Sequence, residues 1–179
     1  TGVVGTKMLE MVEQYKIPYN ELVLFSSKRS SGTELKVNGE TFTVQELTED
    51  KAKDGFDYVI MSAGGSTSEK FAPLFEAAGS IVIDNSSFWR MHEDIDLIVP
   101  EINTPSLNRK IIANPNCSTI QSVIALKPLY DKFGVKRVHY ATYQSVSGSG
   151  AGGIRDLEEG AKGAEPTTYP KPIYNNVIP

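Results

Sequence analysis

The sequence predicts an α/β protein whose main element is a doubly wound parallel sheet. Three observations lead to this fold class. Short apolar runs such as residues 81–83 and 97–99 alternate with segments of helical periodicity, as in parallel βαβ units. A glycine-bearing turn directly precedes the first helical segment. After Gly148 the sequence becomes Gly-rich and then Pro-rich, which indicates a change of domain.

The elements follow in order along the chain. Residues 7–15 have apolar side chains at helical spacing, and residues 22–25 form a short apolar strand that a polar cluster ends. Residues 35–44 alternate around Asn38-Gly39, which is typical of a β-hairpin. The remaining predicted elements are a strand at 58–62, a helix through residue 78, strands at 81–83, 97–99 and 110–113, a helix at 119–133 broken at Pro128, an alternating strand at 135–144 and a helix at 154–162.

These elements divide into two predicted domains. Residues 1–117 form a Rossmann-like dinucleotide-binding domain that lacks its first strand. Residues 118–179 begin an α+β catalytic or dimerisation domain and leave it incomplete. We interpret both ends of the sequence as cuts in a longer chain.

Composition excludes several classes of protein. The 179 residues are 40% hydrophobic and 22% charged, enough apolar material for a core, so wholesale disorder is excluded. A net charge of −4 without a basic block argues against nucleic-acid binding. The apolar runs are far shorter than a membrane span requires. One cysteine and two histidines cannot form a Cys/His metal cage, so we expect a soluble, cytoplasmic protein that binds no metal.

Two turns predict a dinucleotide site. Thr1, Gly2, Val3 and Val4 open a helix, where glycine allows close approach of a pyrophosphate; the alternative is a turn without a ligand. The turn after the strand at residues 22–25 has no acidic residue, which NAD-binding folds place there to bind the ribose 2′-hydroxyl. It instead carries serines and a guanidinium, which suit a 2′-phosphate and therefore favour NADP, unless the turn is only a solvated loop. The candidate residues of this second turn are Arg29 and Ser30.

Cys117 is the candidate nucleophile. It follows the turn Asn114-Pro115-Asn116 and precedes Ser118 and Thr119, which are predicted to cap the long helix. A helix N-terminus favours the thiolate form of a cysteine placed there. A lone cysteine can also be inert core material, but a capped helix start is not a core position.

Further polar residues follow other strands. Arg90 lies after the strand at 81–83, at the edge where open α/β sheets bind ligands, although it could be an ordinary surface arginine. Gln144 could orient a polar substrate, and Ser147 and Gly148 could contact a cofactor, unless they form an ordinary Gly/Ser loop. His92 and His139 have no triad-like context and are interpreted as structural.

Together these motifs resemble the aspartate-semialdehyde dehydrogenases over essentially the whole chain. They are Thr1-Gly2-Val3-Val4-Gly5, the loop 26–32, Asn85-Ser86-Ser87 with Arg90, Asn114-Pro115-Asn116-Cys117-Ser118-Thr119, and the segment 143–148. The Asn-Cys-Ser-Thr segment is the most specific part. Acetylglutamyl-phosphate reductases usually have Gly where Asn116 stands, and glyceraldehyde-3-phosphate dehydrogenases have a different pattern after the cysteine.

The resemblance implies an NADP-dependent oxidoreductase of lysine, threonine and methionine biosynthesis. It would interconvert aspartate 4-semialdehyde plus phosphate and aspartyl 4-phosphate through a thioester on Cys117. Gln144, Arg90 and Asn116 would bind substrate and phosphate. NADP would contact Thr1, Gly2, Val3, Val4, Arg29, Ser30, Ser147 and Gly148. The intact enzyme would be a homodimer or a dimer of dimers.

The resemblance also implies that this sequence is about the first half of such an enzyme. The family's catalytic histidine and further substrate-binding residues would lie after residue 179, so the fragment alone is expected to be inactive. Two alternatives are a related acyl-phosphate reductase and an inactive NADP-binding module. The retention of Cys117, Arg90 and Gln144 favours the enzyme over the module, because a pure binding module needs none of them.

Overall fold

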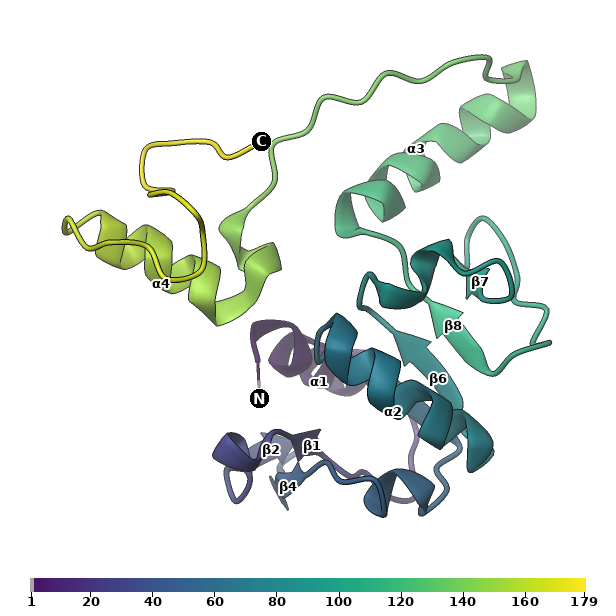
Figure 1. Ribbon diagram of the computed structural model, residues 1–179. Coiled ribbons are helices and arrows are strands. Elements are labelled where there is room, and N and C mark those ends of the chain that lie inside the picture. The colour runs from purple at the N-terminus through teal and green to yellow at the C-terminus, as the bar shows by residue number, and fades with distance from the viewer. Residues whose placement is uncertain (1) are drawn as a thin grey trace. The chain divides into compact units, whose positions relative to one another are not determined.

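The computed structural model describes residues 2–179 and divides into two compact units. The smaller unit consists of the N-terminal segment up to Asn20 and of Ala141–Pro179, and the larger unit is Glu21–Tyr140. Parallel strands with a covering helix in the larger unit confirm the predicted α/β class (Figure 1).

The main sheet of the larger unit has four strands in the order β5-β6-β8-β7, and all neighbouring pairs are parallel. Helix α2 (Gly65–Ala77) connects β5 to β6 and lies across one face of the sheet (Figure 1). This βαβ arrangement is the one predicted from the alternating apolar runs. The strand bounds are β5 (Tyr58–Met61), β6 (Ile81–Asp84), β7 (Asp96–Leu97) and β8 (Ile111–Ala113).

The hydrophobic core lies between this sheet and α2. Successive strand residues point to opposite faces, so Met61, Val82 and Ile111 point toward α2 and are buried against Ala72 and Phe75. The in-register residues of the other face are more accessible. We call Tyr58, Ile60, Ile83 and Ile112 the open sheet face, in which Tyr58 is 68% and Ile60 52% exposed.

Two smaller sheets precede the main one. Strand β1 (Phe25–Ser26) pairs in parallel with β4 (Gln45–Glu46). The strand predicted at residues 22–25 is therefore shorter than expected and begins later. The predicted hairpin is confirmed, since β2 (Glu34–Val37) pairs antiparallel with β3 (Glu40–Thr43). Asn38 and Gly39 join them with φ of 52° and 82°, a left-handed pair that Asn-Gly adopts at little cost.

Helix α3 (Cys117–Phe133) begins two residues before the predicted start and runs through Pro128 without a break. The predicted strand at residues 135–144 is wrong, because this segment has no regular structure. A strand is stable only when its backbone groups pair with a neighbour, and none of the described strands pairs with these residues. Alternating side chains alone therefore do not form a strand here.

The smaller unit contains α1 (Val3–Gln14) and α4 (Gly150–Gly160), which contact each other. Helix α4 starts four residues before the predicted helix, and its first turn packs tightly. A Cβ atom at Gly152 would lie 2.5 Å from Thr168 Oγ1, so a larger residue would displace the segment after the helix. Short 3-10 turns complete the chain at η1 (Lys28–Ser30), η2 (Lys51–Lys53), η3 (Phe88–Met91) and η4 (Val146–Ser149).

Candidate active site

The candidate site lies where β6 and β8 end side by side. Asp84 and Ala113 are partners in the parallel register, so the loops that follow them start at the same edge of the sheet. The ladder continues into both loops, because Asn114 N donates to Asp84 O at 2.8 Å and Asn85 N donates to Met61 O at 2.9 Å. Open α/β sheets bind ligands at this carboxyl edge.

Cys117 is the first residue of α3, and its thiol is exposed and forms no disulfide. Asn116 caps the helix: its Oδ1 accepts hydrogen bonds from Ser118 N at 3.0 Å and from Ser118 Oγ at 2.5 Å. Asn116 thus takes the capping role that the sequence analysis gave to Ser118 and Thr119, because only a residue with extended backbone can turn its side chain back to the first turn. The Sγ of Cys117 lies 3.9 Å from the same Oδ1.

Arg90 ties together the loops after β6 and β8. It extends from η3, is half-buried, and donates from Nε to Asn114 O at 2.9 Å and from Nη2 to Asn85 O at 3.1 Å. Within residues 2–179, no group accepts a hydrogen bond from Nη1. Arg90 is therefore fixed to a carbonyl that lies three residues before Cys117, and its Nη1 group can still donate to a ligand.

The sequence analysis assigned no role to Asp84, Asn85 or Asn114. Asn114 Nδ2 donates to Asn85 Oδ1 at 2.6 Å. Asp84 is fully buried, accepts from Ser86 Oγ at 2.5 Å through Oδ2, and receives no bond at Oδ1 from the described residues. The signal was present in the sequence, since polar residues stand directly after two buried apolar strands.

The residues predicted to bind the cofactor are divided between the two units. Thr1 lies outside the described residues. Gly2 precedes α1 as its N-cap, and a Cβ there would meet nothing within 4 Å, so the backbone at this helix start is accessible. Arg29 and Ser30 belong to the larger unit, where η1 follows β1 and the Arg29 side chain is exposed. Val3 and Val4 form the first turn of α1.

Gln144, Ser147 and Gly148 belong to the smaller unit. Gln144 is exposed in irregular backbone, while Ser147 and Gly148 lie in η4. Ser145 fixes that turn by accepting from Ser147 N at 3.2 Å through Oγ and from Gly148 N at 3.2 Å through its carbonyl. The structure thus brings Arg90, Asn116 and Cys117 together in one unit, and places Gln144 with Ser147 and Gly148 in the other.

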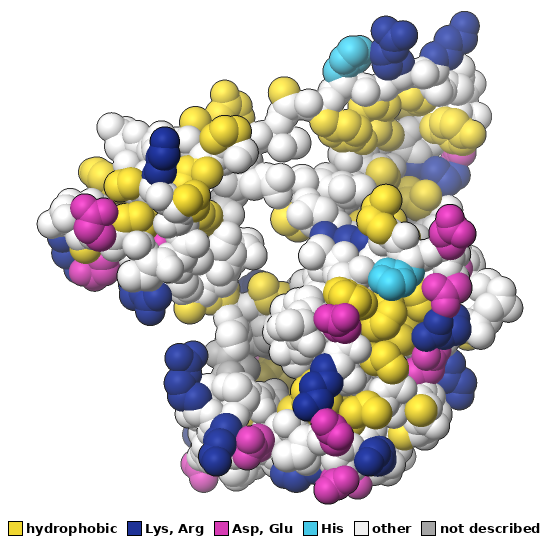
Figure 2. Space-filling view, viewed as in Figure 1, with side chains coloured by type: hydrophobic (Ala, Val, Ile, Leu, Met, Phe, Trp, Pro, Cys, Tyr) yellow, Lys and Arg dark blue, Asp and Glu magenta, His cyan; other side chains and the backbone are white. Residues whose placement is uncertain are grey.

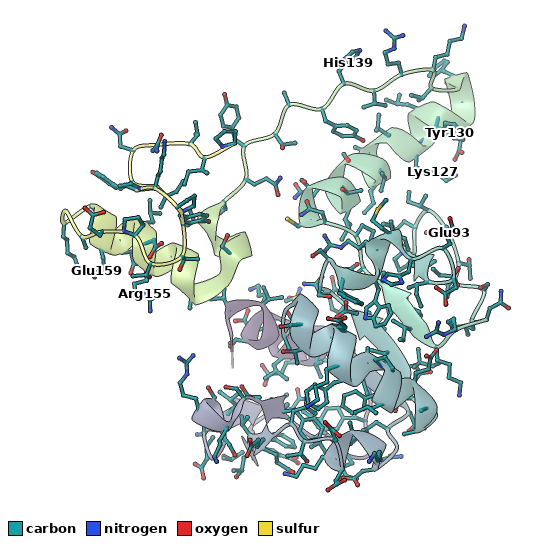
Figure 3. The ribbon with its side chains drawn as sticks, viewed as in Figure 1. Glu93, Lys127, Tyr130, His139, Arg155 and Glu159 are labelled. Atoms are coloured by element: carbon teal, nitrogen blue, oxygen red, sulfur yellow. The ribbon has the colours of Figure 1, made fainter. Side chains whose placement is uncertain are left out.

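Neither histidine has the surroundings of a catalytic base in the described part of the chain. The His92 ring packs against the rings of Phe88 and Trp89, with centroids 5.3 and 4.9 Å away. His139 is exposed on the irregular segment that leads away from α3 (Figure 3). No cluster of three or more His, Cys, Asp or Glu side chains suited to a metal ion occurs among residues 2–179.

The parallel sheet, with a thiol and a guanidinium near its carboxyl edge, defines an α/β protein of the dinucleotide-binding dehydrogenase class. Two family models match the chain: the semialdehyde dehydrogenase NAD-binding domain over residues 1–110 and the semialdehyde dehydrogenase dimerisation domain over residues 126–179. The chain belongs to the semialdehyde dehydrogenase family, which confirms the resemblance found in the sequence.

Its relatives are aspartate-semialdehyde dehydrogenases. The protein of that name from Aquifex aeolicus is 46% identical over 190 residues, covering 100% of this chain and 56% of the relative. Aspartate-semialdehyde dehydrogenase 2 from Vibrio cholerae is 45% identical, again over 100% of this chain and 56% of the relative. The chain therefore spans about half the length of the curated relatives it matches.

Solved structures agree with this assignment. The crystal structure of Vibrio cholerae aspartate semialdehyde dehydrogenase II complexed with ASA matches with a TM-score of 0.91 and 44% identity, covering 98% of this chain and 55% of that one. The Candida albicans enzyme with NADP matches with a TM-score of 0.60 and 26% identity, over 75% of this chain and 46% of that one.

Proposed function

We propose that this chain is part of an NADP-dependent aspartate-semialdehyde dehydrogenase. The enzyme would interconvert aspartate 4-semialdehyde plus phosphate and aspartyl 4-phosphate, on the route to lysine, threonine and methionine. The observation that supports this most directly is the exposed thiol of Cys117 at the first position of α3, three residues from a carbonyl that Arg90 holds. The names of the relatives supply the substrate class.

Cys117 is proposed as the nucleophile. Its sulfur forms a bond to the aldehyde carbon, and the carbonyl π electrons move to oxygen. Loss of hydride from that carbon then leaves a thioester on Cys117. An oxygen of phosphate attacks the thioester carbonyl, the C–S bond breaks, and the sulfur leaves as thiolate to give aspartyl 4-phosphate. The thiolate is regenerated, so the cysteine takes part in every turnover.

Arg90 is proposed to bind the phosphate, since its Nη1 remains available while Nε and Nη2 hold backbone carbonyls. A guanidinium fixed in this way does not have to be ordered when the anion arrives. Asn116 and Gln144 are proposed to hold the semialdehyde near the thiol. Neither His92 nor His139 is proposed as the acid/base group, so the chain alone is expected to turn over little substrate.

The residues that are present fit NADP. The bound cofactor would supply the hydride acceptor. The accessible backbone of Gly2 and the first turn of α1 suit a pyrophosphate, because free N–H groups and the helix dipole favour an anion. The exposed Arg29, beside Ser30, suits the 2′-phosphate. Thr1, Val3, Val4, Ser147 and Gly148 complete the proposed contacts.

We further propose the domain assignment and the surroundings of the enzyme. Residues 1–117 would form the NADP-binding domain and residues 118–179 the start of the catalytic and dimerisation domain, an assignment that the two family models support. The intact enzyme would be a cytoplasmic homodimer. Within residues 2–179, no helix combines the length and apolar character needed to cross a membrane.

The decisive experiment is an assay of the intact protein that carries this chain. NADPH formation is followed with aspartate semialdehyde as substrate, with and without phosphate. We expect turnover that requires both phosphate and NADP. Turnover of acetylglutamate semialdehyde instead would assign the protein to the related acyl-phosphate reductases. NADP binding without turnover of either aldehyde would support the inactive binding module.

A further inference from the structure

The loops after β6 and β8 are joined by one hydrogen bond between two side chains and by two hydrogen bonds from a third side chain to backbone carbonyls. Asn114 Nδ2 donates to Asn85 Oδ1 at 2.6 Å, and Arg90 reaches both backbone carbonyls, Asn85 O at 3.1 Å and Asn114 O at 2.9 Å. The loop after β6 is therefore connected to the loop after β8 by the Asn85–Asn114 side-chain pair and by the Arg90 guanidinium. We call Asn85, Asn114 and Arg90 the loop tether.

The tether lies where it can set the position of the thiol. Only Pro115 and Asn116 separate Asn114 from Cys117. Pro115 is buried and has a fixed φ, and Asn116 is engaged as the helix cap. Few backbone torsions between Asn114 and Cys117 can therefore compensate for a shift of the Asn114 backbone. Such a shift is expected to move the start of α3.

The contacts within the loop tether also determine the orientation of the Arg90 guanidinium. Two nitrogen atoms of the guanidinium, Nε and Nη2, donate to carbonyls, and no acceptor within residues 2–179 contacts Nη1. Without the hydrogen bond between the side chains of Asn85 and Asn114, only Arg90 and the backbone bond from Asn114 N to Asp84 O would hold the two carbonyls in place, so we expect the guanidinium to change orientation more easily. One change would thus affect the nucleophile and the anion-binding group together.

We propose that Asn85 and Asn114 are positioning residues that fix Cys117 relative to the free Nη1 of Arg90. This proposal rests on the proposed function, in which sulfur and phosphate must meet at one carbon. Misplacement of reacting groups by about 1 Å can cost on the order of 100-fold in rate. Loss of the Asn85–Asn114 hydrogen bond is therefore expected to lower kcat strongly. Its effect on the free energy of unfolding should be small, because it is a single, partly exposed hydrogen bond.

The test compares Asn85→Ala and Asn114→Ala with Asn108→Ala in the intact enzyme. Asn108 is exposed in the loop before β8, away from its carboxyl end, and serves as the matched control. We expect both tether variants to lower kcat by roughly tenfold or more and to raise the KM for phosphate, while the Kd for NADP stays unchanged. Asn85→Asp keeps an acceptor for Asn114 Nδ2 and should recover part of the lost kcat.

A second measurement does not depend on turnover. The alkylation rate of Cys117 by iodoacetamide, without substrate, should fall roughly threefold or more in both tether variants, since a loosened helix start weakens the field at the thiol. If the parent enzyme lacks the proposed activity, this rate still tests the tether. Unchanged alkylation in folded tether variants, or kcat values like that of Asn108→Ala, would overturn the proposal. Where Asn114→Ala does not fold, Asn85→Ala removes the same bond.

Discussion

Single residues set the chemistry at the start of α3. Asn116 uses one oxygen to hold the backbone and the hydroxyl of Ser118, which fixes the first turn and leaves Cys117 exposed at its start. The thiol is therefore exposed at the N-terminal end of the helix.

Replacement of the thiol tests the nucleophile. We expect Cys117→Ser in the intact enzyme to lower kcat by several orders of magnitude, because a hydroxyl stays protonated at neutral pH and is a weaker nucleophile. NADP binding should be nearly unchanged, since the thiol has no proposed contact with the dinucleotide. Near-normal turnover of the serine variant, measured at saturating substrate, would make Cys117 structural.

Replacement of Arg29 tests the choice of cofactor. Arg29→Ala should weaken NADP binding by roughly 1.5–3 kcal/mol, because it removes charged hydrogen bonds to the 2′-phosphate, and should change NAD binding little. Binding titrations with both cofactors measure the difference. Lys36→Ala is the control, because Lys36 is an exposed cation that belongs to β2 and not to the turn η1. An equal loss for NADP and NAD would refute the assignment of Arg29.

At the scale of elements, one ion-pair cluster connects α2 to β8. Glu76, near the end of α2, accepts from Arg109 Nε at 2.9 Å, from Arg109 Nη2 at 2.7 Å and from Lys110 N at 2.7 Å. Arg109 also contacts Asp94. The hydrogen bonds from Arg109 hold the pKa of Glu76 below its ordinary value, although partial burial opposes this. The cluster fixes the entry to β8, the strand that leads to Cys117.

This cluster predicts a pH dependence of stability. Because the pKa of Glu76 is lower in the folded state, its contribution is present above the ordinary value of 4.5 and is lost as pH falls through the folded value. Glu76→Gln should lower the free energy of unfolding at neutral pH by roughly 1.5 kcal/mol, with a smaller loss on acidification than in the parent. Urea unfolding over a pH series measures both. Glu69→Gln, an exposed position on α2, should behave like the parent.

In the smaller unit, one carboxylate organises the segment after α4. Buried Asp156 accepts hydrogen bonds from the backbone N–H groups of Thr167, Thr168 and Tyr169 and from the Thr167 hydroxyl. Burial alone would raise the pKa of Asp156, but these hydrogen bonds outweigh it and hold the pKa well below its usual range. Tyr169 in turn donates to Ser149 Oγ at 2.8 Å, next to the turn η4.

Replacement of Asp156 should therefore loosen this segment locally. In Asp156→Asn, the side-chain NH₂ faces backbone donors, so amide exchange of Thr167, Thr168 and Tyr169 should accelerate by roughly tenfold or more. Hydrogen exchange resolved by NMR measures the effect. Glu158→Gln, which changes an exposed carboxylate on the same helix, is the matched control. Equal exchange in both variants would show that the carboxylate does not order the segment.

At the scale of the whole molecule, two apolar surfaces remain accessible. The open sheet face is one. The other lies on α3, which has no buried residue among its 17 and exposes Leu129, Tyr130 and Phe133, with Phe133 73% exposed. Figure 2 shows hydrophobic side chains gathered over this helix. Apolar surfaces of this kind are rare on isolated soluble proteins and mark contacts with further protein.

We therefore expect the 179-residue chain by itself to associate or to bind a hydrophobic dye, because these surfaces face water. The intact protein should bind much less dye per molecule. Light scattering and dye fluorescence at equal molar concentration measure the two effects. The double variant Ile60→Thr with Phe133→Ser should reduce both. A monodisperse monomer that binds no dye would contradict the expectation.

The α/β class and most helices follow from sequence periodicity, and the Asn38-Gly39 turn was predicted because two left-handed residues in succession require those residue types. Segment 135–144 was mispredicted because an alternating pattern specifies a face but does not supply a pairing partner. The cap of α3 was placed two to three residues too late, because serine, threonine and asparagine are all good caps and backbone geometry decides among them.

By itself, the sequence determined the family, the fold class and the identity of the candidate nucleophile, because periodicity and motif order are local properties of the chain. Only the tertiary structure decided that Asn85 and Asn114 bond to each other and that Arg90 holds both loops. The Asn85–Asn114 and Arg90–Asn114 contacts join residues 29 and 24 positions apart, and they exist because β6 and β8 end next to each other in one parallel sheet.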